Sequence, residues 1–372
     1  MFENSSSSFP VRNQSGAGSI DDGDCQFSKD SSEEKVIKVF AYVSILLVSL
    51  VGNTLVIVVV YKNKHLRKSI NYFVFNMAAS DLLMSLTIMP VRIGEIVTGS
   101  SAFMVDSPLL VGNILCKLCY FLPDASVVVS IESLVLIAID RFIAVVYSLK
   151  ATLITSKSRF TCILCAWIVA VGVYAPYFYT FRLFPYEDGS YECKQRWDPA
   201  FEHEETHKWY VTVISITFFI LPVCVLAILY AMIACTVKQN ATKRKRMSSR
   251  RSPRKYQTSR QVLRLSVAII IAFLACIFPM LVNMFMAMSY LHSGGEPTCA
   301  FLTIFQFVSF FMVHSWSAVN PCICFAFGKN YRNGLKYILS REGYGFQMEG
   351  STSRGTKNTI KSTCLQANGS AL

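Results

Sequence analysis

The chain has 372 residues, of which 53% are hydrophobic and 16% are charged, and its mean hydropathy is +0.41. An ordinary soluble domain carries about 25% charged residues, and a soluble fold of this size could not hide so much apolar surface in one core. The composition excludes a soluble, a disordered, a collagen-like and a small disulfide-rich protein, and it predicts an integral membrane protein.

Seven long apolar segments follow one another along the chain. A helix needs about 20 mainly apolar residues to cross a bilayer, and four of the seven segments contain neither a charged residue nor a histidine. Backbone amides in lipid must be hydrogen-bonded within the protein, so long segments predict helices, whereas a barrel would show short alternating strands. We therefore expect an all-α membrane protein, a seven-helix bundle. The segments are 39–61, 69–91, 118–139, 160–181, 209–237, 265–291 and 297–327.

Lysine and arginine gather in every second connecting segment. The segment 238–264 carries eleven of them and no acidic residue, and smaller excesses lie in 61–70, in 150–159 and in the tail from residue 329. Cytoplasmic loops are enriched in Lys and Arg, so we expect the N-terminus outside and the C-terminus inside. The net charge of +13 then follows from topology and gives no reason to expect a nucleic-acid partner.

The first 35 residues lack the apolar core of a cleavable signal peptide. The first helix is therefore expected to direct membrane insertion. Asn4 and Asn13 each begin an Asn-x-Ser triplet on the expected outer side, and both are predicted glycosylation sites.

Four of the thirteen cysteines are expected on the outer side. Cys116, at the outer end of the third segment, and Cys193 face an oxidising compartment and are predicted to form a disulfide. A second bridge between Cys25 and Cys299 is left open. Two cysteine pairs have the spacing of metal ligands, but neither has the further ligands that a metal site needs.

Short motifs in the seven segments resemble, in their order, those of the rhodopsin-like G protein-coupled receptors. Each motif is weak alone, because Gly and Pro are common in membrane helices, but their joint order is specific. The motifs are Gly52-Asn53, Asn76 to Asp81, Cys116, Asp140-Arg141-Phe142, Trp167, Pro222 with Tyr230, Phe273 with Cys276 to Pro279, and Asn320-Pro321. The resemblance covers residues 36–340. It implies a multi-pass plasma-membrane receptor that binds an extracellular ligand and activates heterotrimeric G proteins.

The resemblance also predicts how the chain is divided. Residues 1–36 are expected to form an extracellular glycosylated N-terminus, and 37–327 the receptor bundle in contact with membrane lipids. Residues 328–340 resemble a short amphipathic eighth helix that lies along the inner leaflet. Residues 341–372 are rich in Ser and Thr and are expected to form a cytoplasmic tail.

Asp81 is an ionisable residue near the bilayer midplane, where a charge is costly and marks function. The resemblance implies that Asp81, with Ser130, Ser317 and Asn320, holds Na⁺ and water in the resting state. The alternative is a protonated Asp81 that only joins helices. Trp316 stands beside Ser317, at a position where relatives usually carry a small polar residue. This departure bears on the binding of Na⁺ and not on the aspartate itself. Apart from this structural Na⁺, no cofactor is expected.

Asp140 and Arg141 end the third segment at the expected cytoplasmic face. The resemblance implies that Arg141 pairs with Asp140 at rest and moves to the G protein on activation, and Leu149 is expected to belong to the same coupling surface. Ile277 and Cys324 replace the usual aromatic residues, so the sixth segment is expected to move outward through different contacts. The residues that match the family's repacking core and hinges are Ile131, Pro222, Tyr230, Phe273, Pro279 and Pro321.

Receptor kinases are expected to phosphorylate two segments. They are the Ser/Thr-rich stretch 351–363 and the basic segment around Arg250, Arg251 and Ser252. Each phosphate adds about −1.5 to −2 charges. An arrestin-like partner is expected to bind the phosphorylated protein.

Two positions exclude familiar ligand classes. His314 occupies the place of the lysine that binds retinal, and Pro123 that of the aspartate that binds amines, with Asp124 about 100° further round the helix. The segment around Tyr120 resembles neuropeptide receptors of the tachykinin, neuropeptide Y and RFamide kind, and the acidic outer face suits a basic or amidated peptide. The expected ligand-binding residues are Arg92, Glu95, Asp124, Gln306 and His314.

Several alternatives stay open. Arg92 and Glu95 are one helical turn apart, so they either pair with each other or hold the ligand, and Asp124 needs Arg92 or a cationic ligand group as its partner. The acidic outer face could lack any ligand role, and a lipid or amine receptor could share the fold. A transporter would show internal repeats, which are not seen. No enzyme is expected, because no nucleophile and base are placed together.

Overall fold

The first membrane helix shows how the local sequence sets a helix end. Helix α1 (Ser32–Lys62) begins with a capping box: the Ser31 hydroxyl accepts from the Glu34 amide at 3.2 Å, and the Glu34 carboxylate accepts from the Ser31 amide at 2.8 Å. These bonds satisfy amide groups that the start of a helix leaves without partners. The computed structural model describes residues 30–63, 71–99, 103–105, 109–147, 155–185, 190–247, 253–293 and 299–351.

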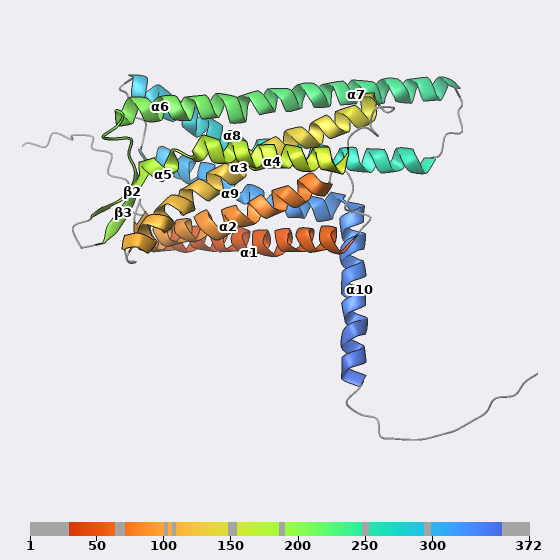
Figure 1. Cartoon of the computed structure of the whole chain (residues 1–372), viewed down its shortest axis with the longest axis horizontal. Helices are drawn as coiled ribbons and strands as arrows, with labels where there is room; N and C mark the ends of the chain where they lie inside the picture. Colours follow the sequence, from red (N-terminus) through yellow and green to blue (C-terminus); the bar gives the residue numbers. More distant parts are fainter. Residues whose placement is uncertain are drawn as a thin grey trace, which may run out of the picture.

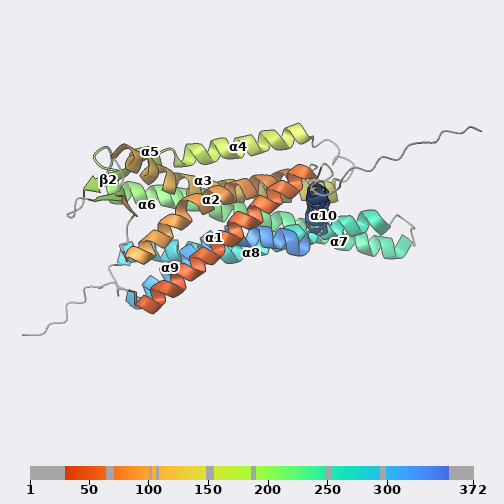
Figure 2. The same cartoon turned by 90° about the horizontal axis from the view of Figure 1, so that it is seen from below.

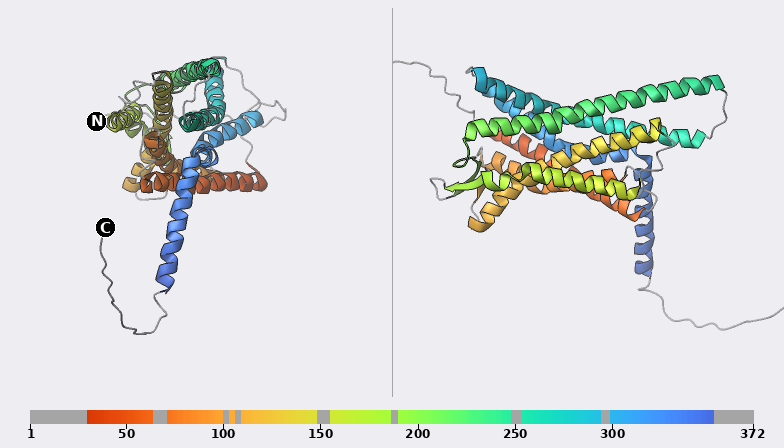
Figure 3. Two further views of the ribbon diagram at one scale, coloured as in Figure 1. Left: turned by 90° about the vertical axis from the view of Figure 1, so that its right-hand side faces the viewer. Right: turned by 45° about the horizontal axis from the view of Figure 1, so that its top comes forward.

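Each of the seven predicted membrane segments is helical over most of its described residues, and the helices run side by side in one bundle (Figures 1 and 3). Six helices of the described part are long and apolar enough to cross a membrane. The remaining long helix, α3, contacts α2, α4, α7 and α8 and so lies at the centre of the bundle. The predicted seven-helix membrane fold is therefore confirmed. The further helices are α2 (Asn71–Thr98), α3 (Leu109–Val146), α4 (Ser156–Tyr174), α5 (Tyr177–Thr180), α6 (His203–Ile214), α7 (Leu221–Met247), α8 (Pro253–Ser293), α9 (Cys299–Phe327) and α10 (Lys329–Ser351).

Prolines explain two departures from the predicted segments. The fourth segment was expected to end at residue 181, but α4 ends at Tyr174, because Pro176 lacks the amide that would continue the helix. The fifth segment begins earlier than expected, as α6, and passes through a π-helical turn, η2 (Ser215–Ile220), into α7. The turn ends two residues before Pro222, whose ring disfavours a regular α-helix.

A small sheet, which the sequence analysis did not predict, lies at the outer end of the bundle (Figure 1). Its strands β1 (Phe103–Val105), β2 (Phe181–Pro185) and β3 (Tyr191–Gln195) are antiparallel in the order β1-β3-β2. Cys193 in β3 is paired with Phe103 on one side and with Leu183 on the other. The central strand therefore carries the cysteine that joins the sheet to the bundle.

Helix α1 runs diagonally across α2 and α9, which it contacts (Figure 2). A Cβ atom on Gly52 would lie 2.7 Å from Cγ of Pro321, so glycine permits this close approach. Next to it, the Asn53 side-chain amide donates to the Ser317 carbonyl at 2.8 Å. The outward faces of the bundle carry exposed apolar side chains such as Phe40 on α1 and Ile168 on α4, as lipid contact requires.

Helix α10 leaves the inner end of the bundle and runs across its long axis (Figure 1), so that it is seen end-on in Figure 2. The Tyr331 hydroxyl donates to the Asn71 side chain at 2.8 Å, and Arg332 donates to the Phe325 carbonyl at 2.9 Å. These bonds fix the turn between α9 and α10. The helix extends to Ser351, past the expected limit at residue 340, and its place on the inner leaflet stays a prediction.

Candidate functional site

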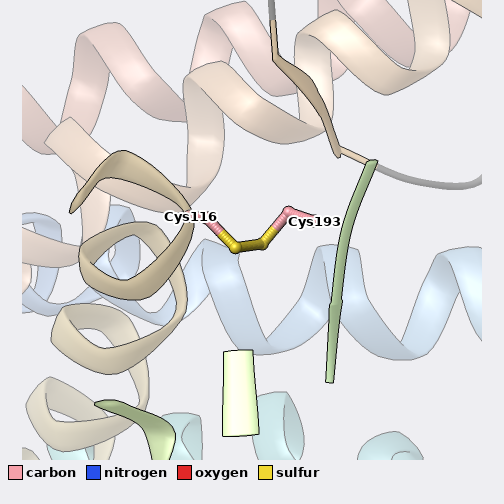
Figure 4. The surroundings of a disulfide bond; sticks show 2 residues. All are labelled: Cys116 and Cys193. Carbon is pink, nitrogen blue, oxygen red and sulfur yellow. A yellow bond between two sulfur atoms is a disulfide. The ribbon is translucent and has the colours of Figure 1, made fainter. Parts of the chain in front are cut away.

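The predicted disulfide between Cys116 and Cys193 is confirmed and joins the outer end of α3 to β3 (Figure 4). The two Cα atoms are 5.6 Å apart, and the bond spans 77 positions of sequence. It holds the sheet over the outer end of the bundle. Several predicted positions lie outside the described residues: Asn4, Asn13, Cys25, Leu149 and the side chain of Cys299.

Arg92 and Glu95, on the outer part of α2, pair with each other. Arg92 Nη1 lies 2.7 Å from Glu95 Oε2, and the side chains are 24% and 10% exposed. The guanidinium also lies over the ring of Phe310 on α9, 4.5 Å from its centroid. The pair thus neutralises both charges within the protein, and contact of these residues with a ligand stays a prediction.

His314, on α9, is packed against α1. Its Nδ1 lies 3.1 Å from the hydroxyl of Tyr42, and the histidine is 5% exposed. Its ring stacks on Phe310 with a centroid distance of 6.3 Å. Gln306, two turns nearer the outer end, is exposed. Three of the five predicted ligand residues, Arg92, Glu95 and His314, therefore lie on the α1, α2 and α9 side.

Asp124 belongs to a separate group on the opposite side of the outer bundle. Its Oδ2 accepts from the hydroxyl of Tyr177 at 2.7 Å. The rings of Tyr174 and Tyr177 are 5.1 Å apart, and those of Tyr177 and Tyr210 are 6.2 Å apart. We call Tyr174, Tyr177 and Tyr210 the tyrosine cluster. Within the described residues Arg92 forms its ion pair with Glu95 and not with Asp124, and a cationic ligand group as the partner of Asp124 stays a prediction.

The sequence analysis missed the tyrosine cluster. A signal was present, since Tyr174 and Tyr177 flank Pro176 at the outer end of the fourth segment. Tyr210 comes from α6, and its hydroxyl donates to the Val173 carbonyl at 2.8 Å. That bond holds α6 against the end of α4, and only the folded chain reveals it.

Asp81 lies in the middle of the bundle and is 1% exposed. Its Oδ2 accepts from the Asn320 side-chain amide at 2.9 Å, and its Oδ1 lies 3.5 Å from the Ser130 hydroxyl. Ser317 is one step further, linked to α2 through Ser85 at 3.5 Å. The structure thus brings Asp81, Ser130 and Asn320 together and places Ser317 beside them.

The Asp81 group has the oxygen donors that a hard cation prefers. Asn320 Oδ1 is buried and accepts no hydrogen bond from the residues that the structure describes. The Trp316 ring packs edge-to-face on Phe273 with a centroid distance of 5.1 Å. A carboxylate, a serine hydroxyl and an amide oxygen without a donor fit a Na⁺ ion.

Asp140 is paired with Arg141, as predicted, and also with Arg159, which was not predicted. Arg141 binds Oδ2, while Arg159 of α4 donates to Oδ1 from Nε at 3.0 Å and from Nη2 at 2.8 Å. Asp140 lies beyond the apolar segment 118–139. Burial alone would raise the pKa of its carboxyl, but the two guanidinium groups hold that pKa below its usual value.

The predicted repacking residues occupy the bundle core. Ile131 and Phe273 are 1% and 2% exposed and belong to one buried apolar cluster, and Tyr230 packs against it. Pro222 lies two residues after the end of the π-helical turn. On α8, the Pro279 carbonyl accepts from the Ser309 hydroxyl of α9 at 3.1 Å. Ile277 and Cys324, in place of the family's usual aromatic residues, are buried at 3% and 1% exposure.

Comparisons with known proteins agree with this geometry. Residues 52–323 match the family described as 7 transmembrane receptor (rhodopsin family). The chain is 29% identical to a QRFP-like peptide receptor of Branchiostoma floridae, over 82% of this chain and 78% of the relative. It is 27% identical to neuropeptide FF receptor 2 of Mus musculus, over 80% and 70% of the two chains. Identity to the substance-P receptor of Aquarana catesbeiana is 26%, over 80% and 69%.

Proposed function

The chain belongs to the rhodopsin family of seven-transmembrane receptors, and from that premise we propose that it binds an extracellular peptide with a basic or amidated end and activates heterotrimeric G proteins. As a member of this receptor family it is a multi-pass protein of the plasma membrane. The relatives named above are peptide or neuropeptide receptors, which supports a peptide over the lipid and amine alternatives.

The single observation that carries the proposal is the environment of Asp124. Its carboxylate accepts a hydrogen bond from a neutral hydroxyl, that of Tyr177, and within the described residues no lysine, arginine or histidine forms an ion pair with it. A carboxylate in a low-dielectric site is costly without a cation. The faces of the tyrosine cluster attract a cation as well. A guanidinium or ammonium group of a ligand would satisfy both.

The outer surface supports a peptide that is positively charged. The helix α6 and the residue before it carry the acids Glu202, Glu204 and Glu205 in a short stretch, while the nearby Asp198 is paired with Arg196. Such a field steers a cationic ligand toward the outer end and raises its association rate. Because Arg92 and Glu95 neutralise each other, Asp124 is our candidate anchor, and Arg92 serves to position the outer ends of α2 and α9.

On the inner side we propose that Arg141 leaves Asp140 and contacts the G protein. The Asp140 carboxylate lies 5% exposed at the inner end of α3, where movement of α8 would uncover it. Receptor kinases and an arrestin-like partner would then act on the Ser/Thr-rich tail. We also propose that Na⁺ binds at Asp81 in the resting state, since the buried Asn320 oxygen supports it.

The first experiment is a cell assay of calcium and cAMP responses. It compares synthetic peptides that end in Arg, an aromatic residue and an amide with the same peptides ending in a free carboxylate. We expect at least one amidated peptide to activate cells that express the chain, and untransfected cells to stay silent. Silence toward every cationic peptide, together with activation by a neutral lipid, would overturn the peptide proposal.

The second experiment separates binding from coupling. Arg141→Ala should keep the affinity for the active peptide, because Arg141 lies at the other end of α3 from Asp124, and should lose most G protein activation. Binding and nucleotide exchange are measured on the same membranes, with surface expression as the control. Full nucleotide exchange by this variant would contradict the proposed coupling site.

A further inference from the structure

The carboxylate of Asp140 is shared between two arginines from different helices. Arg141, its neighbour on α3, binds Oδ2, and Arg159 on α4 binds Oδ1 through two N–H groups at 2.8 and 3.0 Å. The three side chains are 5%, 15% and 11% exposed for Asp140, Arg141 and Arg159. Each oxygen of the carboxylate therefore has its own guanidinium, and neither guanidinium needs to leave for the other to bind.

The position of Arg159 is unfavourable for its own helix. The N-terminus of an α-helix carries a partial positive charge that favours acids. The first turn of α4, however, contains no acidic residue. It contains two basic residues instead, Lys157 and Arg159. Lys157 is exposed to solvent, whereas Arg159 is turned inward to α3. The favourable contact that offsets this repulsion for Arg159 is the carboxylate of Asp140.

Because Arg159 shares the carboxylate, the free energy needed to release Arg141 from Asp140 changes. A buried carboxylate that loses its only cation is strongly destabilised. Here Arg159 stays on Oδ1 through a charge-assisted fork when Arg141 departs, so the carboxylate remains paired in both states. We propose that Arg159 is a positioning residue that retains Asp140 and thereby favours the release of Arg141. This rests on the proposed role of Arg141 in coupling and adds to it a residue that sets the resting equilibrium.

The proposal predicts that loss of the Arg159 charge makes opening of the inner end rarer. Of the two guanidinium groups that the described residues place on the buried carboxylate, Arg141 remains when the Arg159 charge is removed, so the Asp140–Arg141 pair becomes stronger. The resting state should then gain population, and spontaneous opening of the inner end should become rarer. If Arg159 merely braced α3 against α4, its loss would loosen the inner end and make opening more frequent.

The test measures opening without a G protein or a ligand. A fluorescent unnatural amino acid replaces the exposed Arg264 on α8 in the purified full chain in lipid nanodiscs, and single-molecule fluorescence counts openings of the inner end. The variants are Arg159→Gln, the matched control Lys157→Gln, Asp140→Asn and the double variant of Arg159→Gln with Asp140→Asn. Failure of G protein activation would leave this assay untouched, so the two proposals fail separately.

We expect Arg159→Gln to lower the opening frequency by about tenfold, and Lys157→Gln to leave it unchanged. Asp140→Asn should raise it, and the double variant should match Asp140→Asn, because Arg159 acts only through the carboxylate. An unchanged or raised frequency in Arg159→Gln would overturn the proposal, as would a further decrease in the double variant.

A second variant decides the question if Arg159→Gln does not fold. Arg159→Lys keeps the charge but loses the planar fork that holds the carboxylate at two points. We expect it to lower the opening frequency by a smaller factor, about threefold. Opening at the wild-type frequency or above would again contradict the role assigned to Arg159.

Discussion

His314 is a buried polar residue in the outer half of the bundle that is hydrogen-bonded to another side chain. Its Nδ1 is paired with the Tyr42 hydroxyl at 3.1 Å, and Tyr42 is 1% exposed. A buried polar atom that loses its partner costs about 1–3 kcal/mol. Tyr42→Phe should therefore lower the melting temperature of the purified receptor by several degrees. The exposed Gln306, on the same helix, serves as the control.

Gln306→Ala should leave the melting temperature unchanged, because its side chain is exposed. An equal melting temperature for Tyr42→Phe and the wild type would show that the bond to His314 contributes little. In that case His314 would again be a candidate for direct ligand contact.

Asp81 supplies a second test at the scale of single residues. If Na⁺ binds there, a concentration ten times the dissociation constant stabilises the folded receptor by about 1.4 kcal/mol. The melting temperature of the wild type should then be higher in sodium chloride than in choline chloride of equal ionic strength. Asp81→Asn should remove this difference, because it removes the charged oxygen. A wild-type receptor that melts identically in both salts would leave Asp81 as a purely helix-joining residue.

At the scale of elements, the disulfide links a three-stranded sheet to the central helix. A bond of this kind stabilises by about 2–4 kcal/mol. Cys116→Ala and Cys193→Ala should each strongly reduce surface expression, and the double variant should be no worse than either single one, since the bond needs both. Flow cytometry with an outer epitope tag measures this directly. Normal expression of both single variants would contradict the structural role of the bond.

The membrane helices could be predicted from the sequence because long apolar runs have one stable solution in lipid. The π-helical turn before Pro222 follows from the missing amide of proline, and the early end of α4 follows from Pro176. The sheet could not be predicted. Its strands are three to five residues long, and their pairing depends on a disulfide that joins distant parts of the chain.

For a similar reason, the sequence did not predict two side chains that bind the aspartates of the candidate sites. Tyr177 reaches Asp124 from a position 53 residues away, and Arg159 reaches Asp140 from 19 residues away. The sequence marked both aspartates as groups that need a counterpart, but it offered Arg92 or the ligand for Asp124 and the neighbouring Arg141 for Asp140. Tertiary packing decided which side chain met each carboxylate.

At the scale of the whole molecule, α3 connects the two ends where the chemistry lies. Asp124 and Asp140 are separated by 16 positions of this helix, or roughly 24 Å along its axis. The inner ends of α7 and α8 extend beyond the rest of the bundle (Figure 1). A ligand at Asp124 and a G protein at Arg141 would therefore act on the same rigid element, and displacement of α8 would couple them.

The central claim is that Asp124 binds the cationic group of the peptide, and a cycle between ligand and receptor tests it most directly. The active amidated peptide is compared with one in which its arginine is replaced by citrulline, which keeps the shape and removes the charge. Binding is measured on the wild type, on Asp124→Asn and on the control Glu95→Gln.

On the wild type, citrulline should weaken binding by about tenfold or more, the scale of a charge-assisted hydrogen bond of roughly 1.5–3 kcal/mol. Asp124→Asn should bind both peptides equally weakly, and Glu95→Gln should keep the discrimination. The same loss for citrulline on Asp124→Asn as on the wild type would contradict the account, because the charge would then be recognised elsewhere.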